Sequence, residues 1–233
     1  MIDAWSAWSP IFDGLLWERR LRARNGFELR SAAIELRGGG VAVFSPSSGL
    51  DPQDLASHAG EVRYLLAPNH FHYLGIRRWR DACPGAQAVA SSQARKRLVK
   101  KLDVPWADLE ELRAHLPEGA RLVIPDGTRS GEVWWEIQRG DERVLVVCDA
   151  FFNLETLPGG MVGFVCKVTD TGPDLALGKT FKYLALGDRQ AYKAFTLRYL
   201  EDHPPTVLVP MHGEVARGAD LAKRLAELVR TRL

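Results

Sequence analysis

The chain contains little cysteine. Three cysteines occur in 233 residues, Cys83, Cys148 and Cys166, and they form no Cys-X-X-Cys pair. Small secreted domains held by disulfides carry many cysteines in even numbers, and most structural zinc sites need closely spaced pairs. An odd, widely spaced set fits neither class. We therefore expect a reducing, cytoplasmic environment and a fold that is stabilised by its hydrophobic core.

Long hydrophobic runs and an excess of charge are also missing. No segment approaches the ~18 apolar residues that a membrane helix needs, and the N-terminus lacks the basic and apolar stretches of a secretory signal. The 31 basic and 29 acidic side chains leave a formal charge of +2, so no global field attracts nucleic acid. We expect a soluble protein without a membrane or nucleic-acid partner.

One local basic patch departs from this balance. Arg95, Lys96 and Arg97 lie close to Lys100 and Lys101. Such a cluster is either the solvated face of a helix or a surface that binds phosphate groups. We interpret the cluster as the solvated face of a helix, with a phosphate-binding surface as the alternative.

The first half of the chain begins as an antiparallel meander. Asn25-Gly26 separates two strand-like segments within residues 15–37, which is a strong hairpin signal, and a buried strand over 41–44 follows. Asp51 and Pro52 mark one helix start, and Ser91 and Ser92 mark another. Strands and helices then alternate through residue 102, which implies parallel strands with crossover helices.

The second half repeats this scheme. A hairpin turns at Gly140-Asp141, a helix is expected over 188–202, a strand over 206–211 and a last helix over 218–232. Residues 151–185, rich in glycine, are expected to form a long irregular connection that is functional or mobile. The 233 residues, 46% of them hydrophobic, suit a single α/β domain spanning 1–233, built as two sheets flanked by helices.

Histidines stand where an apolar run ends. His70-Phe71-His72 follows the run 64–69, and in an extended backbone residues i and i+2 point to the same side. A strand tip of this kind could present both imidazoles to one metal ion.

Two further apolar runs end in potential ligands. Asp149 follows the run 145–148, and His212 follows the run 207–211. Ligand sites in α/β sheets gather at the carboxyl ends of strands. We therefore predict that His70, His72, Asp149 and His212 converge on one site.

The order of these elements resembles the metallo-β-lactamase fold family, an αββα sandwich with two mixed sheets. That family carries a His-X-His-X-Asp-His motif, an aspartate after a later strand and a histidine after the last strand. His70, His72, Asp149 and His212 match four of these positions. More narrowly, the segment 67–72, followed by Trp79 and Pro84, resembles an uncharacterised branch of the family.

Several positions depart from the family pattern. Leu74 and Gly75 stand where the family has Asp and His, and Thr128 or a neighbour replaces a third histidine, with Asp126 as the nearby candidate substitute. Ser45-Pro46-Ser47 occupies the place of the usual Asp-X-Gly turn. The resemblance therefore implies at most one metal ion rather than two.

The resemblance implies a hydrolase-like protein acting on an ester, thioester or phosphodiester. Its metal ligands would be His70, His72, Asp149 and His212, with Asp149 holding the attacking water and His212 assisting as acid or base. Zinc is the expected ion, and iron or manganese are alternatives, because two histidines and one carboxylate also suit non-haem iron.

Two alternatives remain open at this point. In one, the protein is an inactive member of the fold that binds a small molecule or a protein, with no metal and with the histidines hydrogen-bonded to Asp149. In the other, it is a mononuclear iron protein.

Other residues carry weaker signals. Cys148 precedes Asp149 on a strand, so we expect its side chain to face the opposite way and to pack in the core. Trp134 and Trp135 should face opposite sides of a strand, one in the core and the other lining a cleft or a partner contact. Trp5, Trp8 and Phe12 are expected to cover a sheet edge, with a homodimer contact as the alternative.

Overall fold

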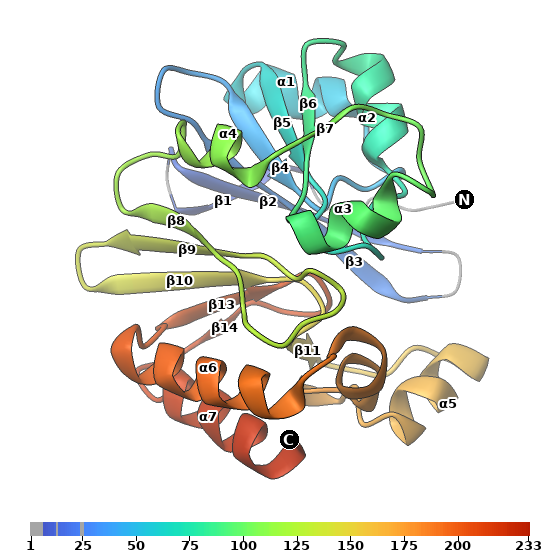
Figure 1. Cartoon of the computed structure of the whole chain (residues 1–233), viewed down its shortest axis with the longest axis vertical. Coiled ribbons are helices and arrows are strands. Elements are labelled where there is room, and N and C mark those ends of the chain that lie inside the picture. The colour runs from blue at the N-terminus through green and yellow to red at the C-terminus, as the bar shows by residue number, and fades with distance from the viewer. Residues whose placement is uncertain (1–6, 13, 24–25) are drawn as a thin grey trace. The chain divides into compact units, whose positions relative to one another are not determined.

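The computed structural model describes residues 7–12, 14–23 and 26–233 (Figure 1). The chain divides into two compact units, which are described separately. The first unit comprises Met1–Arg24 and Glu28–Glu118, and the second comprises Asn25–Phe27 and Gly119–Leu233. Trp5 lies outside the described residues, whereas Trp8 and Phe12 are buried.

A seven-stranded sheet, with its strands in sequence order, forms the centre of the first unit. The strands are β1 (Ser9–Phe12), β2 (Leu16–Arg22), β3 (Glu28–Glu35), β4 (Val41–Phe44), β5 (Val62–Leu66), β6 (Gln87–Val89) and β7 (Trp106–Ala107). Pairs from β1 to β4 are antiparallel, and pairs from β4 to β7 are parallel. The predicted change from a meander to crossover units is confirmed.

Three helices connect the parallel strands of this unit, and a fourth follows β7. They are α1 (Pro52–Ala59), α2 (Ile76–Ala82), α3 (Ser92–Leu98) and α4 (Leu109–Arg113). Asp51 accepts a hydrogen bond from the backbone N–H of Gln53, and Ser91 accepts one from Ala94, so both predicted caps are confirmed. The helices bury Leu55 and Trp79 in one core cluster, in which each large side chain contributes about 1.5–3 kcal/mol.

The second unit contains a five-stranded sheet in the order β14-β13-β10-β9-β8. Its strands are β8 (Ala120–Val123), β9 (Trp134–Arg139), β10 (Glu142–Val147), β13 (Val207–Pro210) and β14 (Ala216–Arg217). The hairpin predicted at Gly140-Asp141 joins β9 to β10, with Arg139 opposite Glu142. Strands β10 and β13 are parallel neighbours, and this pairing positions the candidate site.

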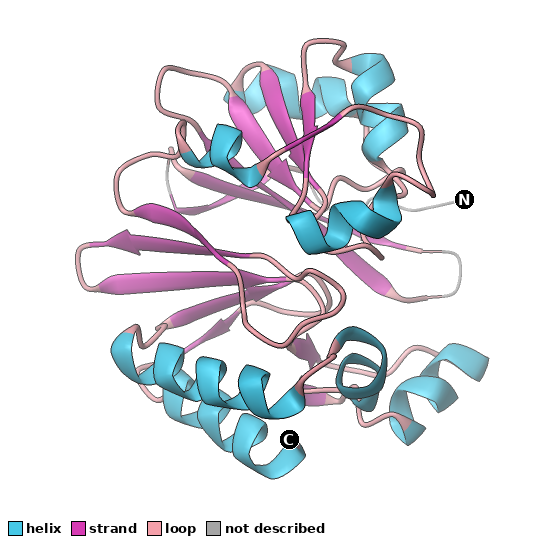
Figure 2. Cartoon of the chain, in the orientation of Figure 1, coloured by secondary structure: helices cyan, strands magenta, loops and turns pink. Residues whose placement is uncertain are grey.

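The segment 151–185 is not the irregular connection that the sequence predicts. It contains β11 (Phe152–Leu154), α5 (Gly160–Val168), β12 (Asp174–Ala176) and the π-helical turn η1 (Phe181–Ala185) (Figure 2). β11 and β12 pair as a separate two-stranded sheet. Some of the glycines that suggested a loop delimit short elements, for example Gly159 as the N-cap of α5, whereas Gly163 is buried inside that helix.

Two long helices complete the second unit, α6 (Arg189–Asp202) and α7 (Leu221–Arg232). They pack over an aromatic cluster in which the Trp134 ring lies 5.5 Å from Tyr199 and 6.4 Å from Tyr192, measured between centroids. Trp135 is buried as well, so it offers no exposed partner contact. Nowhere in the described part of the chain does a helix have the length and apolarity needed to cross a bilayer.

Candidate metal centre

Asp149 and His212 follow neighbouring parallel strands. Val147 of β10 pairs with Pro210 of β13, and the backbone N–H of Met211 donates to the carbonyl of Val147 over 3.1 Å. Each potential ligand stands two residues beyond this last pair. The carboxyl ends of adjacent parallel strands meet at one sheet edge, and this brings the two side chains together as the sequence predicts.

The two side chains are in direct contact. His212 Nε2 lies 3.3 Å from Asp149 Oδ1, and both side chains are largely shielded from solvent. The His212 ring is stacked on Phe152, with centroids 5.2 Å apart and planes inclined by 11°, and Phe27 lies 4.8 Å away on a tilted plane. Aromatic packing therefore fixes the orientation of His212.

Gly213 permits the turn that follows His212. Its φ of +92° is left-handed, and an added Cβ would lie 2.1 Å from the carbonyl oxygen of Asn153. Asn153 also binds this turn through backbone hydrogen bonds to His212 (3.2 Å) and Glu214 (2.7 Å). Only glycine suits this position, because any side chain would meet the Asn153 backbone.

Glu132 is a residue that the sequence analysis missed. Its carboxylate is fully buried, and Oε1 accepts hydrogen bonds from the backbone N–H groups of Asp149 (3.0 Å) and Ala150 (3.1 Å) and from the Trp134 indole (3.4 Å). Charge-assisted bonds of this kind are stronger than neutral ones. An acidic residue two positions before strand β9 was the available signal.

Cys148 does not face away from Asp149 as predicted. β10 ends at Val147, so the alternation of a strand stops before Cys148, and one potential ligand atom from each of Glu132, Cys148 and Asp149 lies within 4.8 Å of the others. Burial raises the pKa of the Cys148 thiol well above its usual value, and the negative charges of Asp149 and Glu132 raise it further. The predicted burial of Cys148 is confirmed.

The histidines of the first unit do not occupy an extended strand tip. β5 ends at Leu66, and Asn69 Oδ1 accepts hydrogen bonds from the backbone N–H groups of Phe71 (2.8 Å) and His72 (3.1 Å). An asparagine side chain that binds the backbone two and three residues later bends the chain. The expectation of two imidazoles on one side of a strand is therefore wrong.

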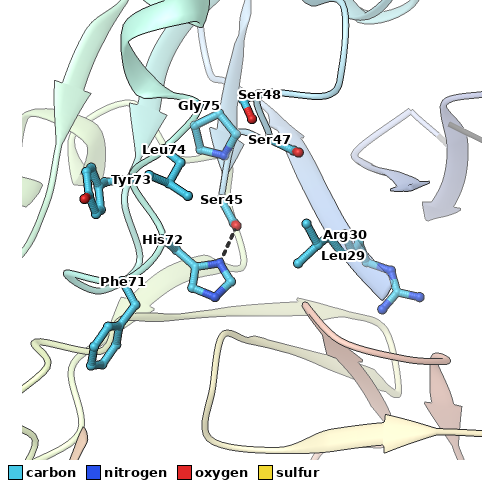
Figure 3. A pocket seen from close by; sticks show the side chains of 11 residues that line it. Leu29, Arg30, Ser45, Ser47, Ser48, Phe71, His72, Tyr73, Leu74 and Gly75 are labelled. Carbon is cyan, nitrogen blue, oxygen red and sulfur yellow. Dashed lines mark hydrogen bonds between the residues drawn. The ribbon is translucent and has the colours of Figure 1, made fainter. Parts of the chain in front are cut away.

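His72 points toward the end of β4. Its Nδ1 lies 2.8 Å from Ser45 Oγ, as Figure 3 shows by a dashed line. Ser45 has a left-handed φ of 54°, and its backbone is held by hydrogen bonds to Leu66 (3.0 Å) and to the Ser31 hydroxyl (2.7 Å). A ring that donates from Nδ1 presents a lone pair at Nε2, which is the usual arrangement of a histidine that binds a metal.

His72 also borders a small cavity. The cavity measures about 160 Å³, and its walls include Leu29, Pro46, Tyr73 and Leu74 (Figure 3). This volume is close to the roughly 150 Å³ that accommodates a benzene ring in a well-studied engineered cavity. The space beside His72 therefore suits a small, mainly apolar group.

His70 is turned toward α3 instead. Arg97 donates to His70 Nε2 over 3.0 Å, and the Lys101 ammonium donates to the His70 carbonyl over 3.2 Å. Arginine is always protonated, so Nε2 must be the acceptor and the neutral ring carries its proton on Nδ1. Binding of a metal through Nε2 would require Arg97 to move.

The basic patch on α3 and just after it thus forms hydrogen bonds with residues 70–72, which are called the histidine segment below. Arg97 and Lys101 contact His70, and Arg95 forms an ion pair with Asp108 over 2.8 Å. Lys96 and Lys100 are exposed. Arg97 and Lys101 are exposed too, so the patch is a solvated surface as predicted, and two of its cations also contact His70.

The positions that depart from the family pattern offer no obvious substitute ligands. Leu74 is 73% exposed, and a Cβ on Gly75 would lie 2.0 Å from the Pro46 carbonyl oxygen. Thr128 Oγ1 donates to the Pro125 carbonyl over 3.4 Å. Asp126 is exposed, and the groups of potential ligands found among the described residues do not include it.

The Asp149 and His212 atoms fit a shared metal ion. Two ligand atoms that each lie about 2.1 Å from a tetrahedral zinc are roughly 3.4 Å apart, and the observed separation is 3.3 Å. One oxygen and one imidazole nitrogen form a donor set suited to zinc, iron or manganese. The structure thus brings two of the four predicted ligands together, and the convergence of His70 and His72 on them stays a prediction.

Solved structures with a similar fold are numerous. A metallo-β-lactamase from Pontibacter korlensis is 12% identical, with a TM-score of 0.63 and coverage of 99% of both chains. The DIM-1 metallo-β-lactamase is 11% identical, with a TM-score of 0.67 and full coverage of both chains. A metal-soaked flavodiiron core, Flv1 from Synechocystis sp. PCC6803, is 14% identical at a TM-score of 0.60 and covers 96% of this chain and 60% of its own.

No protein-family model matches the sequence, and no curated protein matches it. At these identities the solved structures establish the fold alone. They confirm the predicted α/β class, with two large mixed sheets and flanking helices.

Proposed function

We propose that this chain, which has the metallo-β-lactamase fold, is a metal-dependent hydrolase-like protein with at most one ion per chain. The proposed ligands are Asp149 and His212 together with His72, and His70 joins them only if Arg97 releases it. The observation that carries the proposal is the contact of Asp149 with His212 at the ends of two parallel strands.

Each residue has a role in this scheme. Bound at Asp149 and His212, a zinc ion would lower the pKa of its water to about 7 and so supply hydroxide at neutral pH. Asp149 accepts a hydrogen bond from the attacking water and orients it toward the substrate. His212, fixed between Phe27 and Phe152, holds or returns a proton as the leaving group departs.

The surroundings of the histidine segment favour an anionic substrate. The ammonium of Lys101 lies 4.9 Å from the centroid of the Tyr73 ring. Lys96 on α3 and Lys100 just after this helix are exposed. Within the ester, thioester and phosphodiester range, this basic and aromatic surface favours substrates that carry phosphate or carboxylate groups. The cavity beside His72 would hold a small apolar part of such a substrate.

A metal-free binding protein is the second candidate. The contact between Arg97 and His70 favours it, because this contact occupies a ring nitrogen that the proposed family site would use. A hydrogen bond between His212 and Asp149 would then take the place of the metal.

The test begins with metal analysis of the protein purified without an affinity tag or chelator. Wild type and Asp149→Asn are then compared on a panel of esters, thioesters and phosphodiesters with zinc, manganese or iron added. We expect one ion per chain and a loss of at least about 100-fold in rate for the variant. A wild type that carries no metal and never exceeds the variant would establish the binding protein instead; an iron-loaded protein without hydrolytic activity would favour a mononuclear iron protein.

A further inference from the structure

Glu132 is a buried carboxylate next to the proposed metal ligand Asp149, and the proposed function gives it no role. It lies four residues after Thr128, in the segment where the resemblance places a third histidine ligand, and two residues before β9. Its side chain is fully buried, which is costly for a carboxylate unless strong partners compensate. The contacts of this buried group therefore indicate what it does.

Those contacts converge on the backbone of the proposed ligand. Oε1 accepts from the N–H groups of both Asp149 and Ala150, the first two residues after Cys148. β10 ends at Val147, so no strand partner holds residues 149 and 150 in register. Within β10, neighbouring strands accept the backbone hydrogen bonds. At residues 149 and 150 a single carboxylate oxygen of Glu132 accepts them instead.

The Trp134 indole fixes the carboxylate in turn. It donates to the same Oε1 over 3.4 Å from a fully buried position in the core of the second unit. Tyr192, also fully buried, has a pKa raised first by burial and then by the negative charge of Glu132. Its hydroxyl therefore stays protonated beside the carboxylate. Glu132 thereby links the rigid aromatic core to the backbone of Asp149.

We infer that Glu132 is the positioning residue of Asp149. It does not replace the missing histidine as a ligand; it fixes the direction in which the Asp149 carboxylate leaves the sheet. Groups that orient metal ligands in this way typically change metal affinity by 10–100-fold when removed. The effect on metal binding rests on the proposed function, whereas the effect on the Asp149 backbone does not.

The experiment uses the full chain with Glu132→Gln and Glu132→Ala. Glu136→Gln is the matched control, because Glu136 is a second buried carboxylate, on the following strand β9, and is paired with Arg121 instead. Proton chemical shifts and exchange rates of the Asp149 and Ala150 amides are measured by NMR in metal-free protein. Zinc and cobalt affinities are measured by titration, with the cobalt absorption spectrum reporting coordination.

In the Gln variant we expect both amide protons to shift upfield, since a neutral acceptor forms a weaker hydrogen bond than a charged one. Metal affinity should fall about 10–100-fold, with the fold retained. The Ala variant should also lose at least tenfold of the exchange protection at both amides. The Glu136→Gln control should leave the two amides and the metal affinity unchanged.

The positioning role of Glu132 and the proposed metal site can be refuted independently of each other. If both amide shifts in Glu132→Gln equal those of wild type, the positioning role is overturned, whether or not the Ala variant folds. If both amides respond and metal affinity does not change in a protein that binds metal, positioning is overturned as a determinant of the site. If both amides respond and wild type binds no metal, Glu132 positions Asp149 and the metal proposal fails alone.

Discussion

His212 Nε2 lies 3.3 Å from Asp149 Oδ1, although the two residues are 63 positions apart along the chain. The parallel pairing of β10 with β13 produces this contact, because each residue stands two positions beyond the last strand pair. The contact is compatible with one shared ion and with a histidine–carboxylate hydrogen bond. Experiments that count metal ions distinguish the two directly.

Metal stoichiometry is the first prediction. Leu74 and Gly75 cannot coordinate, so elemental analysis should find at most one transition-metal ion per chain, and His72→Ala and His212→Ala should each abolish its binding. Trp79→Phe, a core change that touches no proposed ligand, serves as a control for folding. Two ions per chain would mean that further ligands exist.

Gly213 gives a second prediction, on stability. Gly213→Ala should destabilise the fold by roughly 3 kcal/mol or more, because a left-handed backbone costs an L-residue about 1–2 kcal/mol and the new Cβ would also meet Asn153 at 2.1 Å. Gly39→Ala is the matched control, since Gly39 has the same φ of +92° with nothing within 4 Å. Urea unfolding of both variants measures the difference; equal losses would refute the steric part of the argument.

The third prediction concerns Arg97 and Lys101. Arg97→Gln and Lys101→Gln should raise KM for an anionic substrate several-fold with little change in kcat. Higher salt concentration should likewise raise the KM of the wild type for this substrate. Lys96→Gln, an exposed position on the same helix, should have a smaller effect. An equal response of KM to all three variants would argue for a diffuse field instead of a defined contact.

Arg97→Gln offers a fourth, separate prediction. Because Arg97 donates to His70 Nε2, its removal makes this lone pair available and should strengthen zinc binding if His70 is a ligand. Titration of the variant with zinc measures the change. Unchanged affinity would restrict the site to His72, Asp149 and His212.

The fifth prediction is a loss of stability at alkaline pH. Burial raises the pKa values of Cys148 and Tyr192 above their ordinary values of 9.0 and 10.0, so in the folded protein both groups keep their protons when the unfolded chain releases them. The free energy of unfolding should therefore be unaffected near pH 7 and fall as the pH rises above about 9. Unfolding curves between pH 7 and 11 measure this slope, and Cys148→Ala should reduce it; an identical slope in the variant would contradict the assignment.

The sequence predicted the half of the site that depends on regular structure. Asp149 and His212 follow continuous apolar runs, and such runs identify buried parallel strands whose ends must meet. The positions of the hairpins and of the Asp51 and Ser91 caps were predictable for the same reason, since they depend on local chemistry.

The other half of the site depends on side-chain hydrogen bonds, which the hydrophobic periodicity of a sequence does not predict. Asn69 competes for the backbone N–H groups of Phe71 and His72 and bends a segment that reads as an extended strand end. Glu132 resembles any acidic residue beside a strand until the fold brings the Asp149 backbone to it. In residues 151–185, short elements bounded by glycine and proline have too few residues to show a period.

Gly75 limits how the site can be redesigned. An added Cβ there would lie 2.0 Å from the Pro46 carbonyl oxygen, so the segment from Ser45 to Ser48 occupies the space that a larger residue would need. A histidine introduced at position 75 by a single substitution would therefore damage the fold before it could bind an ion. An engineered ligand at this position requires a redesigned Ser45–Ser48 loop first.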